Sequence, residues 1–558
     1  MSDTFRLFAS LRGYRRAYLR PDLIAGLTVW AVMVPEGLAY ASIAGVPTVV
    51  GLYAAVPALI LYAAVGSSRH LVVGPMAATA ALSAAIIAPL AGGDTGRFIA
   101  LTTALAVVTG IVALLAAVAR LGFVASFISE PVLKGFIVGL ALTIIVGQVP
   151  ALLGVDKRSG DFFEQLVGVL GGLGDIDWWT AVVGIVSLIL VLGMKRWVPL
   201  LPGSLIVVIL GIVTVYLFAL DDHGVEVVGE ISAGLPSLGL PSGLALTDYL
   251  GLIGPAAGVV LIGFAEGLGA AKTYAAKAGY TVDPNRELGG LGLANLGSGF
   301  SSGMVVNGSL SKTAVNGGAG ARTQASGLLV AGLVIVTLLV LTPLFEKLPE
   351  ATLAAVVIAA VVELVDTPAL RALFRVWSPR LARAYGLPTR LDFLSAVAAM
   401  VGVLVFDTLP GLVIGIAVSI LLLLYRASRP HVAALAREDT RWVDVAYSPG
   451  LATEPGVLVV RVEGGLFFAN ADHVRDRIEG MTDDETRAVV VDAETSPFID
   501  VTAVQMLNDL RDSLARKNVR LRVARDIGEF RDVVHAVDPK NPIELYPTVT
   551  EAVADLGD

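Results

Sequence analysis

The chain contains the stretches GPMAATA at residues 74–80 and GSLSKTA at residues 308–314. Both read Gly, four residues, Thr-Ala, and each opens a short apolar segment, at about 74–90 and 309–318. Interrupted segments at corresponding places in the two halves of a chain are typical of inverted repeats in membrane proteins. We therefore predict two related halves, with chance similarity in Ala- and Gly-rich sequence as the alternative interpretation.

The composition around these stretches indicates an α-helical integral membrane protein. Of 558 residues, 55% are hydrophobic and only 16% are charged, whereas soluble domains have about 25% charged residues. Apolar runs of about 18 or more residues, long enough to cross a bilayer, recur from Leu23 to Leu424. We predict about fourteen segments, seven in each half, because an odd number per repeat inverts the second half. The predicted segments are 23–40, 48–65, 74–90, 99–119, 124–148, 178–194, 200–220, 250–275, 288–302, 309–318, 323–344, 350–363, 391–407 and 410–427.

Basic residues predict the orientation of these segments. An excess of Lys and Arg marks the cytoplasmic side of a membrane protein. Residues 1–20 and the 371–390 stretch each hold five arginines, whereas the 221–248 stretch is acidic. With an even number of segments, we expect both termini in the cytoplasm and the protein in the cytoplasmic membrane of the cell.

The end of the chain differs in charge and pattern from the rest. Residues 1–430 hold 26 basic and 24 acidic residues, a net charge of +2, whereas residues 431–558 hold 14 and 24, a net charge of −10. From Gly456 onward short β-branched runs alternate with helical patterns, which is typical of a small α/β domain. We predict a membrane domain at 1–430, a linker at 431–455 and a cytoplasmic α/β domain at 456–558. The acidic tail gives a nucleic-acid partner no electrostatic support.

Several kinds of chemistry find no support in the sequence. The absence of cysteine excludes disulfides, thiolate metal sites and cysteine nucleophiles. The five histidines are too few and too scattered to suggest a metal cluster. His70 and His431 flank apolar spans and His473 opens a helix of the tail, and we expect an ordinary surface role for each of the three. The Gly-rich stretch 289–303 lacks a preceding strand and predicts close helix packing by small residues instead of a dinucleotide site. We therefore expect no metal, no cofactor and no enzyme activity.

The two short segments predict an anion-binding site. A helix that starts inside the membrane points free N–H groups and the positive end of its dipole at a bound ion. For the serines and threonine the alternative is helix capping, and for Lys312 it is an interfacial lysine that reaches to water. The predicted site residues are the backbone of Met76, Ala77 and Ala78, together with Ser309, Ser311, Lys312 and Thr313.

Two acids lie within apolar segments, Glu36 and Glu266. A charged side chain at the bilayer centre costs roughly 2.5–3.5 kcal/mol or more, so an intramembrane acid is a functional hypothesis by default. Either acid is a candidate for carrying a coupled proton. The alternative is a static ion pair, for example of Glu266 with Lys272 or Lys312. Pro35 and Gly37 predict a local break of the helix beside Glu36.

Taken in order, a set of short motifs resembles the sulfate permease family of anion transporters along nearly the whole chain. Each motif alone is weak, but their order and spacing are specific. The motifs are PDLIAGLTV (21–29), VPEGLAYA (34–41), GLY (51–53), GSSR (66–69), GP (74–75), DPNREL (283–288), GLAN (292–295), SLSKTAVN (309–316) and GARTQ (320–324).

The resemblance implies seven-plus-seven inverted repeats, a core that moves against a gate, and an anion between the third and tenth segments. It also implies a C-terminal STAS-like domain, similar to anti-sigma-factor antagonists and often involved in dimerisation. The residues that it places around the anion are Glu36, Tyr40, Met76, Ser311 and Lys312.

The sequence departs from the family pattern at two of these positions. The family often has Gln at Glu36 and Arg at Lys312. Glu266 matches an acid of proton-coupled sulfate symporters in the family, whereas sodium-coupled bicarbonate members have Asp there. In the tail, Thr502 is a candidate for phosphorylation, with helix capping as the alternative.

These features together favour a proton-coupled anion symporter that works by alternating access, in contact with membrane lipid and as a homodimer. Its expected substrate is sulfate, bicarbonate or a small dicarboxylate. The alternatives are a sodium-coupled bicarbonate transporter, a membrane-anchored sensor that signals through its tail, and a passive anion channel.

Overall fold

The computed structural model describes residues 7–554 apart from 128, 158–159, 199–200, 230–232, 363–364, 366–367, 369–370, 372–387, 407, 449, 452 and 541. The chain divides into two compact units. The helical unit comprises residues 1–376 and 392–419, and the C-terminal unit comprises residues 377–391 and 420–558.

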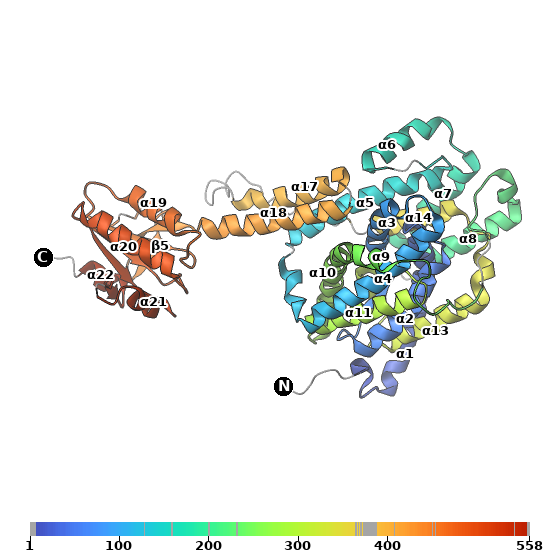
Figure 1. Cartoon of the computed structure of the whole chain (residues 1–558), viewed down its shortest axis with the longest axis horizontal. Coiled ribbons are helices and arrows are strands. Elements are labelled where there is room, and N and C mark those ends of the chain that lie inside the picture. Colours follow the sequence, from blue (N-terminus) through green and yellow to red (C-terminus); the bar gives the residue numbers. More distant parts are fainter. Residues whose placement is uncertain are drawn as a thin grey trace. The chain divides into compact units, whose positions relative to one another are not determined.

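Long apolar helices build the helical unit (Figure 1). Within the described residues, six helices are long and apolar enough to cross a membrane, and α2, α3, α8 and α14 are shorter apolar helices. This confirms the predicted helical membrane fold, while the number of fourteen segments stays a prediction. The helices are α1 (Arg16–Ile43), α2 (Val49–Val65), α3 (Ala77–Ala91), α4 (Thr95–Val118), α5 (Glu130–Leu153), α6 (Phe162–Gly171), α7 (Trp178–Trp197), α8 (Gly203–Phe218), α9 (Leu246–Gly251), α10 (Ile253–Ala278), α11 (Pro284–Phe300), α12 (Leu310–Gly318), α13 (Ala325–Val336), α14 (Glu350–Val362), α17 (Pro388–Phe406) and α18 (Thr408–Ser428).

A pair of short strands lies at the centre of this unit. Strand β1 (Val72–Gly74) pairs antiparallel with β2 (Asn307–Ser309), and both strands are fully buried. α3 begins soon after β1 and α12 begins directly after β2. The two sequence stretches thus form equivalent strand-to-helix junctions; the two short helices were predicted, whereas the strands before them were not. The antiparallel pairing makes the two junctions run in opposite directions.

Glycines allow the helices around these strands to pack closely, as the stretch 289–303 predicts. A Cβ atom on Gly292 would lie 2.9 Å from Leu114 of α4, and one on Gly297 would lie 2.4 Å from Leu61 of α2. Small residues let helix backbones approach one another inside a membrane. Helix α11 is therefore held between α4 and α2.

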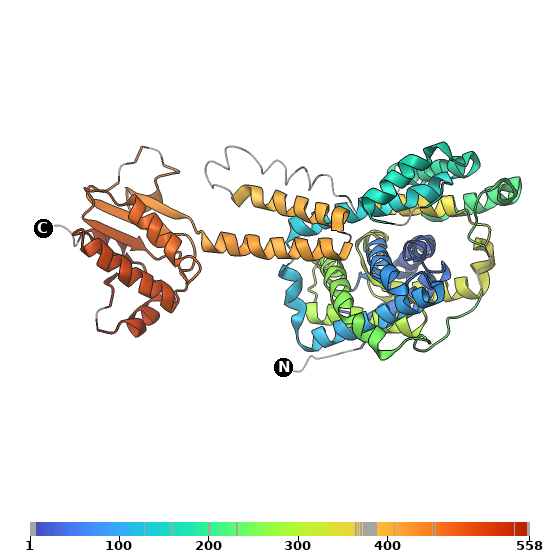
Figure 2. The same ribbon diagram turned by 45° about the horizontal axis from the view of Figure 1, so that its top comes forward.

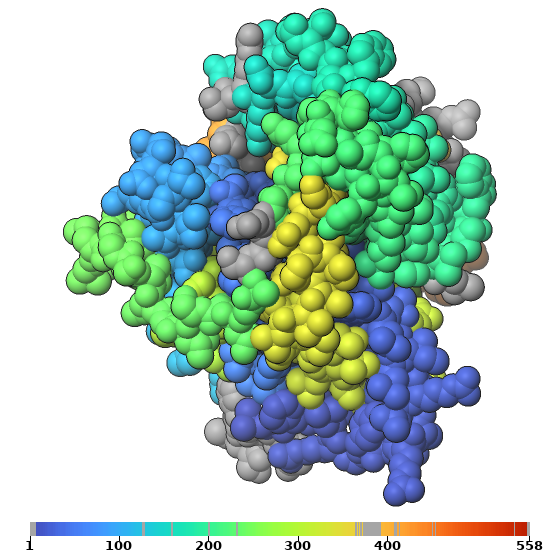
Figure 3. Space-filling model, turned by 90° about the vertical axis from the view of Figure 1, so that its right-hand side faces the viewer, coloured from blue at the N-terminus to red at the C-terminus, as the bar shows by residue number. Residues whose placement is uncertain are grey.

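The long connection between α8 and α9 lies along the segment between α13 and α14. Its backbone amides at Val228 and Gly234 donate hydrogen bonds of 3.0 Å to the carbonyl oxygens of Leu348 and Leu338. Figure 3 shows green stretches of this connection lying beside the yellow segment on one face of the molecule. This contact covers backbone groups that the segment would otherwise expose.

The C-terminal unit is a six-stranded sheet with the order β4-β3-β5-β6-β7-β8. Strands β5 to β8 are parallel, β3 and β4 are antiparallel, and helices pack on both faces, which confirms the small α/β domain (Figure 2). The elements are β3 (Val432–Glu438), β4 (Arg441–Asp444), β5 (Val457–Val462), α19 (Ala471–Met481), β6 (Ala488–Asp492), α20 (Val501–Ala515), β7 (Arg520–Ala524), α21 (Phe530–Val537), β8 (Leu545–Tyr546) and α22 (Val549–Ala554).

The predicted linker at 431–455 is wrong in its first half. Strands β3 and β4 lie there and extend the sheet, with β3 paired to β5. Ala433 and Leu435 of β3 are buried against Val459 and Val490. The sequence of β3 is rich in Ala and ends in charged residues, so it lacks the β-branched pattern by which strands are recognised.

We expect a fragment of residues 430–558 to be soluble and to unfold cooperatively on heating. A fragment of residues 456–558 lacks β3 and β4, which uncovers the backbone edge of β5 and part of the core. Such exposed edges promote aggregation. Circular dichroism and size-exclusion chromatography of the two fragments test this, and equal stability of the shorter fragment would contradict the role assigned to β3 and β4.

Candidate anion site

The starts of α3 and α12 are brought together by the β1–β2 pair. Met76 precedes α3 in extended conformation, and Met76, Ala77 and Ala78 are all buried. Ser309 caps α12, because its hydroxyl accepts a hydrogen bond of 3.2 Å from the backbone amide of Lys312. Two helix N-termini with their dipoles thus lie beside the same pair of strands, which is an arrangement suited to an anion.

Lys312 is buried between these two helix starts. It is 1% exposed, so the alternative of an interfacial lysine reaching to water is wrong. Its Nζ lies 2.7 Å from Glu36 Oε2 and 4.7 Å from the centre of the Tyr40 ring. It also donates a hydrogen bond of 3.2 Å to the carbonyl oxygen of Pro75, just before α3. The lysine therefore contacts both repeats and α1.

Glu36 is the partner of Lys312 and is only 4% exposed. Its Oε2 meets the distance of an ion pair, yet no hydrogen bond of good geometry reaches this atom within the described residues. A buried ion pair with few supporting hydrogen bonds is only weakly stabilising. The pair leaves Lys312 without a net positive charge to offer an anion while Glu36 is ionised.

The predicted helix break beside Glu36 is wrong, because α1 runs continuously through Pro35 and Gly37. Gly37 instead serves packing between helices. A Cβ atom on Gly51 of α2 would lie only 2.0 Å from the Gly37 carbonyl oxygen. The two glycines hold α1 and α2 in close contact at the level of Glu36.

Glu266 lies on α10 and is partly buried. It forms no ion pair or hydrogen bond in the described part of the chain, so the static pairs considered for it, with Lys272 or Lys312, are absent. Lys312 is the charged group whose field acts on its carboxylate. Glu266 is therefore an unpaired acid near the Lys312–Glu36 pair.

The remaining predicted residues have separate positions. Ser311 exchanges a 3.2 Å hydrogen bond with Ser309 at the start of α12. The Thr313 hydroxyl accepts a hydrogen bond of 3.1 Å from the backbone amide of Val72, and this bond joins α12 to β1. Thr502 lies in the C-terminal unit in the exposed first turn of α20. Asp500 caps this helix, so the capping alternative for Thr502 is wrong.

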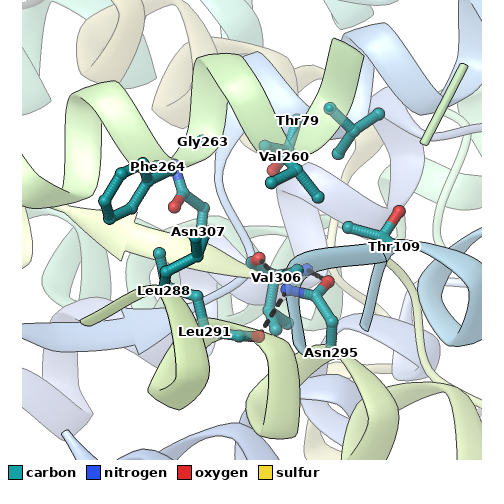
Figure 4. Close-up of a pocket in the computed structure, with 12 residues that line it drawn as sticks. Thr79, Thr109, Val260, Gly263, Phe264, Leu288, Leu291, Asn295, Val306 and Asn307 are labelled. Atoms are coloured by element: carbon teal, nitrogen blue, oxygen red, sulfur yellow. Dashed lines mark hydrogen bonds between the residues drawn. The ribbon is translucent and has the colours of Figure 1, made fainter. Parts of the chain in front are cut away.

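A small internal cavity lies beside β2 and is too small for the anion. Figure 4 shows Asn307 beneath Gly263 and Phe264 of α10, and Asn295 bonded to Leu291 and Val306. The cavity volume is about 10 Å³, which suits roughly one water molecule. Hydrogen bonds of 2.9–3.0 Å between Asn295 and Val306 fix the approach to β2.

Two buried polar residues that anchor this region, Glu287 and Asp22, were not singled out from the sequence. Glu287 accepts four hydrogen bonds, from Tyr62, both the backbone and the hydroxyl of Ser67, and the backbone of Ser68. Asp22 accepts three from the segment 322–323. Glu287 lies in the motif DPNREL and Asp22 lies in the motif PDLIAGLTV. A charged residue within such a motif was the signal by which the sequence could have indicated each anchor.

His70 is a further buried anchor of this region, so the predicted surface role for it is wrong. It is 7% exposed. Its Nδ1 lies 3.0 Å from the Tyr280 hydroxyl and its Nε2 lies 3.0 Å from the Ala321 carbonyl oxygen. His70 thus connects the loop before β1 with the segments that follow α10 and α12.

Glu287→Ala is expected to destabilise the protein strongly, because it leaves several buried donors without an acceptor. Each such donor costs about 1–3 kcal/mol, so we expect a loss above about 3 kcal/mol. Tyr62→Phe removes one of the four bonds and should cost about 1 kcal/mol. Glu130→Ala is the matched control, because Glu130 is exposed and its one ion pair among the described residues is with Lys134. Thermal unfolding in detergent measures the three effects, and similar values for all three would contradict the anchoring role.

The fold and this site define a membrane transport protein for anions, with a buried lysine between two facing helix starts. The chain belongs to the sulfate permease family. The model of that family matches residues 19–379, and the STAS domain model matches residues 448–552. The chain is therefore an anion transporter of this family and not an enzyme.

Individual relatives cover almost the whole chain. A probable sulfate transporter of Mycobacterium tuberculosis is 36% identical over 550 residues, which are 97% of this chain and 96% of the relative. Sulfate transporter 1.2 of Arabidopsis thaliana is 30% identical, over 99% of this chain and 87% of the relative.

Solved structures support the fold. The structure of SLC26A9 matches with a TM-score of 0.86 at 22% identity, covering 98% of this chain and 92% of that chain. The transmembrane domain of the cyanobacterial bicarbonate transporter BicA matches with a TM-score of 0.57 at 24% identity, covering 69% and 98%. The predicted helical transporter fold with a C-terminal STAS domain is thereby confirmed.

Proposed function

We propose that this chain is a secondary active transporter that takes up a small anion together with a proton by alternating access. The observation that carries the proposal is the buried contact between Lys312 and Glu36 at the facing starts of α3 and α12. Residues 1–430 form the transport domain in this proposal, and the STAS-like domain lies outside the translocation path.

The charge of the site favours an anion only when Glu36 is neutral. Lys312 supplies one positive charge, and each helix start supplies roughly half a charge. Their sum of about +2 matches a dianion, whereas an ionised Glu36 would compete with the anion for Lys312. A proton on Glu36 releases the lysine, so anion and proton binding strengthen each other.

Glu266 is the second proton-coupling residue in this proposal. Its carboxylate is unpaired and feels the field of Lys312. An anion bound at Lys312 partly neutralises the lysine, so the ionised carboxylate of Glu266 loses part of its electrostatic stabilisation. Protonation of Glu266 then compensates for the negative charge that the anion adds. The anion itself would contact the backbone of Met76, Ala77 and Ala78, with Tyr40, Ser309, Ser311 and Thr313 bounding the site.

Sulfate is the proposed substrate, because relatives that align along the whole chain carry the name sulfate transporter. Bicarbonate and a small dicarboxylate fit the same chemistry, since backbone N–H groups accept any of these anions. Sodium-coupled bicarbonate uptake is the second candidate, supported by the fold that this chain shares with the transmembrane domain of BicA.

The protein acts in this proposal as a homodimer in the cytoplasmic membrane, with both termini in the cytoplasm and lipid around its apolar helices. A sensor that signals through its tail is the competing class, and a passive channel is another. Deletion of the tail, residues 431–558, separates transporter from sensor, because a transporter lacking it should still bind anion. A channel would not accumulate anion against its gradient.

Uptake of labelled sulfate, bicarbonate and succinate into proteoliposomes tests the proposal. An inwardly directed proton gradient without sodium should drive accumulation of the substrate above its external concentration. Accumulation that needs sodium at fixed pH would favour the bicarbonate alternative, and entry that never exceeds equilibrium would favour a channel.

A further inference from the structure

A cavity of about 120 Å³ lies between α1, α5 and α14, near the end of α1 that is remote from the N-terminus. Its polar lining residues are Ser42 of α1, Gln148 of α5, Glu350 of α14 and Lys157, which follows α5. A water molecule needs roughly 10–15 Å³ of such space. The cavity therefore has room for several waters or for one small anion.

The cavity lies about one helical turn from Glu36 along α1. Its lining includes Ala39, which follows Glu36 by three residues on the same face of the helix, and Glu36 is the partner of Lys312. With a rise of 1.5 Å per residue, Ser42 lies about 9 Å beyond Glu36 along α1. The cavity thus extends along α1 from about one turn beyond Glu36 to the end of the helix.

The surroundings of this cavity are mainly acidic. A neighbouring cavity of about 110 Å³ shares Glu350 with it and is also lined by Asp156, Asp177 and Glu226. Lys157 is exposed and forms no ion pair or hydrogen bond with any residue that the structure describes. Its charge acts on Glu350 without direct contact. An anion that approaches here meets four carboxylates and, among the described lining residues, a single cation.

We propose that this cavity is the entry by which the anion reaches Lys312, and that Lys157 draws the anion in past these carboxylates. The inference rests on the proposed function, but it concerns the approach of the anion and not the coupling. Charges at the rim of a site act on the rate of encounter and are screened by salt. Neutralising Lys157 should therefore raise KM at low ionic strength and leave kcat unchanged.

A thiol probe measures the local potential without relying on transport. The chain has no cysteine, so Ser42→Cys introduces a unique thiol into the cavity. The measured quantity is the ratio of the rate at which an anionic methanethiosulfonate reacts with this thiol to the rate for a cationic methanethiosulfonate. We expect this ratio to be higher when Lys157 is present. Lys157→Gln should lower this ratio roughly two- to fivefold at low salt, and high salt should remove the difference.

Matched variants control this measurement. Lys347 lines neither cavity and forms an ion pair with Asp221, so Lys347→Gln should leave the ratio unchanged. Glu350→Gln should raise the ratio, because it removes a negative charge from the lining. Gln148→Cys serves as a second probe position in case Ser42→Cys does not fold.

Uptake kinetics complete the test. Lys157→Gln should raise the KM for external sulfate severalfold at low ionic strength, and Lys347→Gln should not. The inference would be overturned if Lys157→Gln left the ratio of reaction rates unchanged. It would also be overturned if external reagents reached the thiol at neither probe position. Absence of uptake by the unmodified protein would instead overturn the proposed function, while the thiol measurement would still decide the role of Lys157.

Discussion

Lys312→Met is expected to weaken anion binding severely. The lysine supplies the buried cation at the facing helix starts, and removing one member of a buried charge pair weakens binding by roughly 2–5 kcal/mol, or about 30-fold or more in Kd. Lys312→Arg keeps the positive charge and should retain most of the binding. Isothermal titration calorimetry with sulfate in detergent measures these changes directly.

The same substitution should lower stability, because it leaves Glu36 buried without its partner. Breaking a buried ion pair from one side costs about 3–5 kcal/mol. The double variant Glu36→Gln/Lys312→Met has no buried charge at this position, so it should regain stability without regaining binding. Unchanged affinity in Lys312→Met, or restored binding in the double variant, would contradict the assignment of Lys312 to the anion site.

Glu36→Gln is expected to uncouple the anion from the proton. In the unmodified protein, the anion binds together with a proton on Glu36. Sulfate binding should therefore tighten about tenfold for each unit by which the pH falls, over the range in which Glu36 must gain this proton. The variant carries a permanently neutral side chain that mimics the protonated acid. Its sulfate affinity should be high and should lose the part of the pH dependence that Glu36 contributes, and its accumulation of anion in a pH gradient should fall while anion exchange continues.

Glu266→Gln serves as the companion variant. If both acids take part, it should also lose accumulation driven by the pH gradient while exchange persists. Full acid-stimulated accumulation in both single variants would show that neither acid carries the proton. Retention in one variant only would assign the coupling to the other residue.

The parts of the site that could be predicted from the sequence are charged residues that stand within apolar segments and short stretches that share a pattern. A lysine and two acids stand out in apolar segments, and the shared pattern of 74–80 and 308–314 indicates the two helix starts. The pairing of Lys312 with Glu36 instead of Glu266 depends on which face of α1 meets α12. No local pattern in the sequence contains that information.

Other misjudgements have the same kind of cause. Pro35 predicts a break when α1 is considered alone, but packing against α2 through Gly37 and Gly51 accompanies a continuous helix. His70 flanks an apolar span and so suggests a surface position, yet Tyr280 and Ala321 cover it from distant parts of the chain. Tertiary contacts decide each of these cases.

The central claim is that each anion enters together with a proton through the site of Lys312 and Glu36. Its most direct test is the internal pH of proteoliposomes that contain a trapped pH indicator and no sodium, after sulfate is added outside. The account predicts that sulfate entry acidifies the interior, and that Glu36→Gln reduces this acidification per sulfate while sulfate exchange continues. Sulfate entry without acidification in the unmodified protein, or entry only when sodium is added, would contradict it.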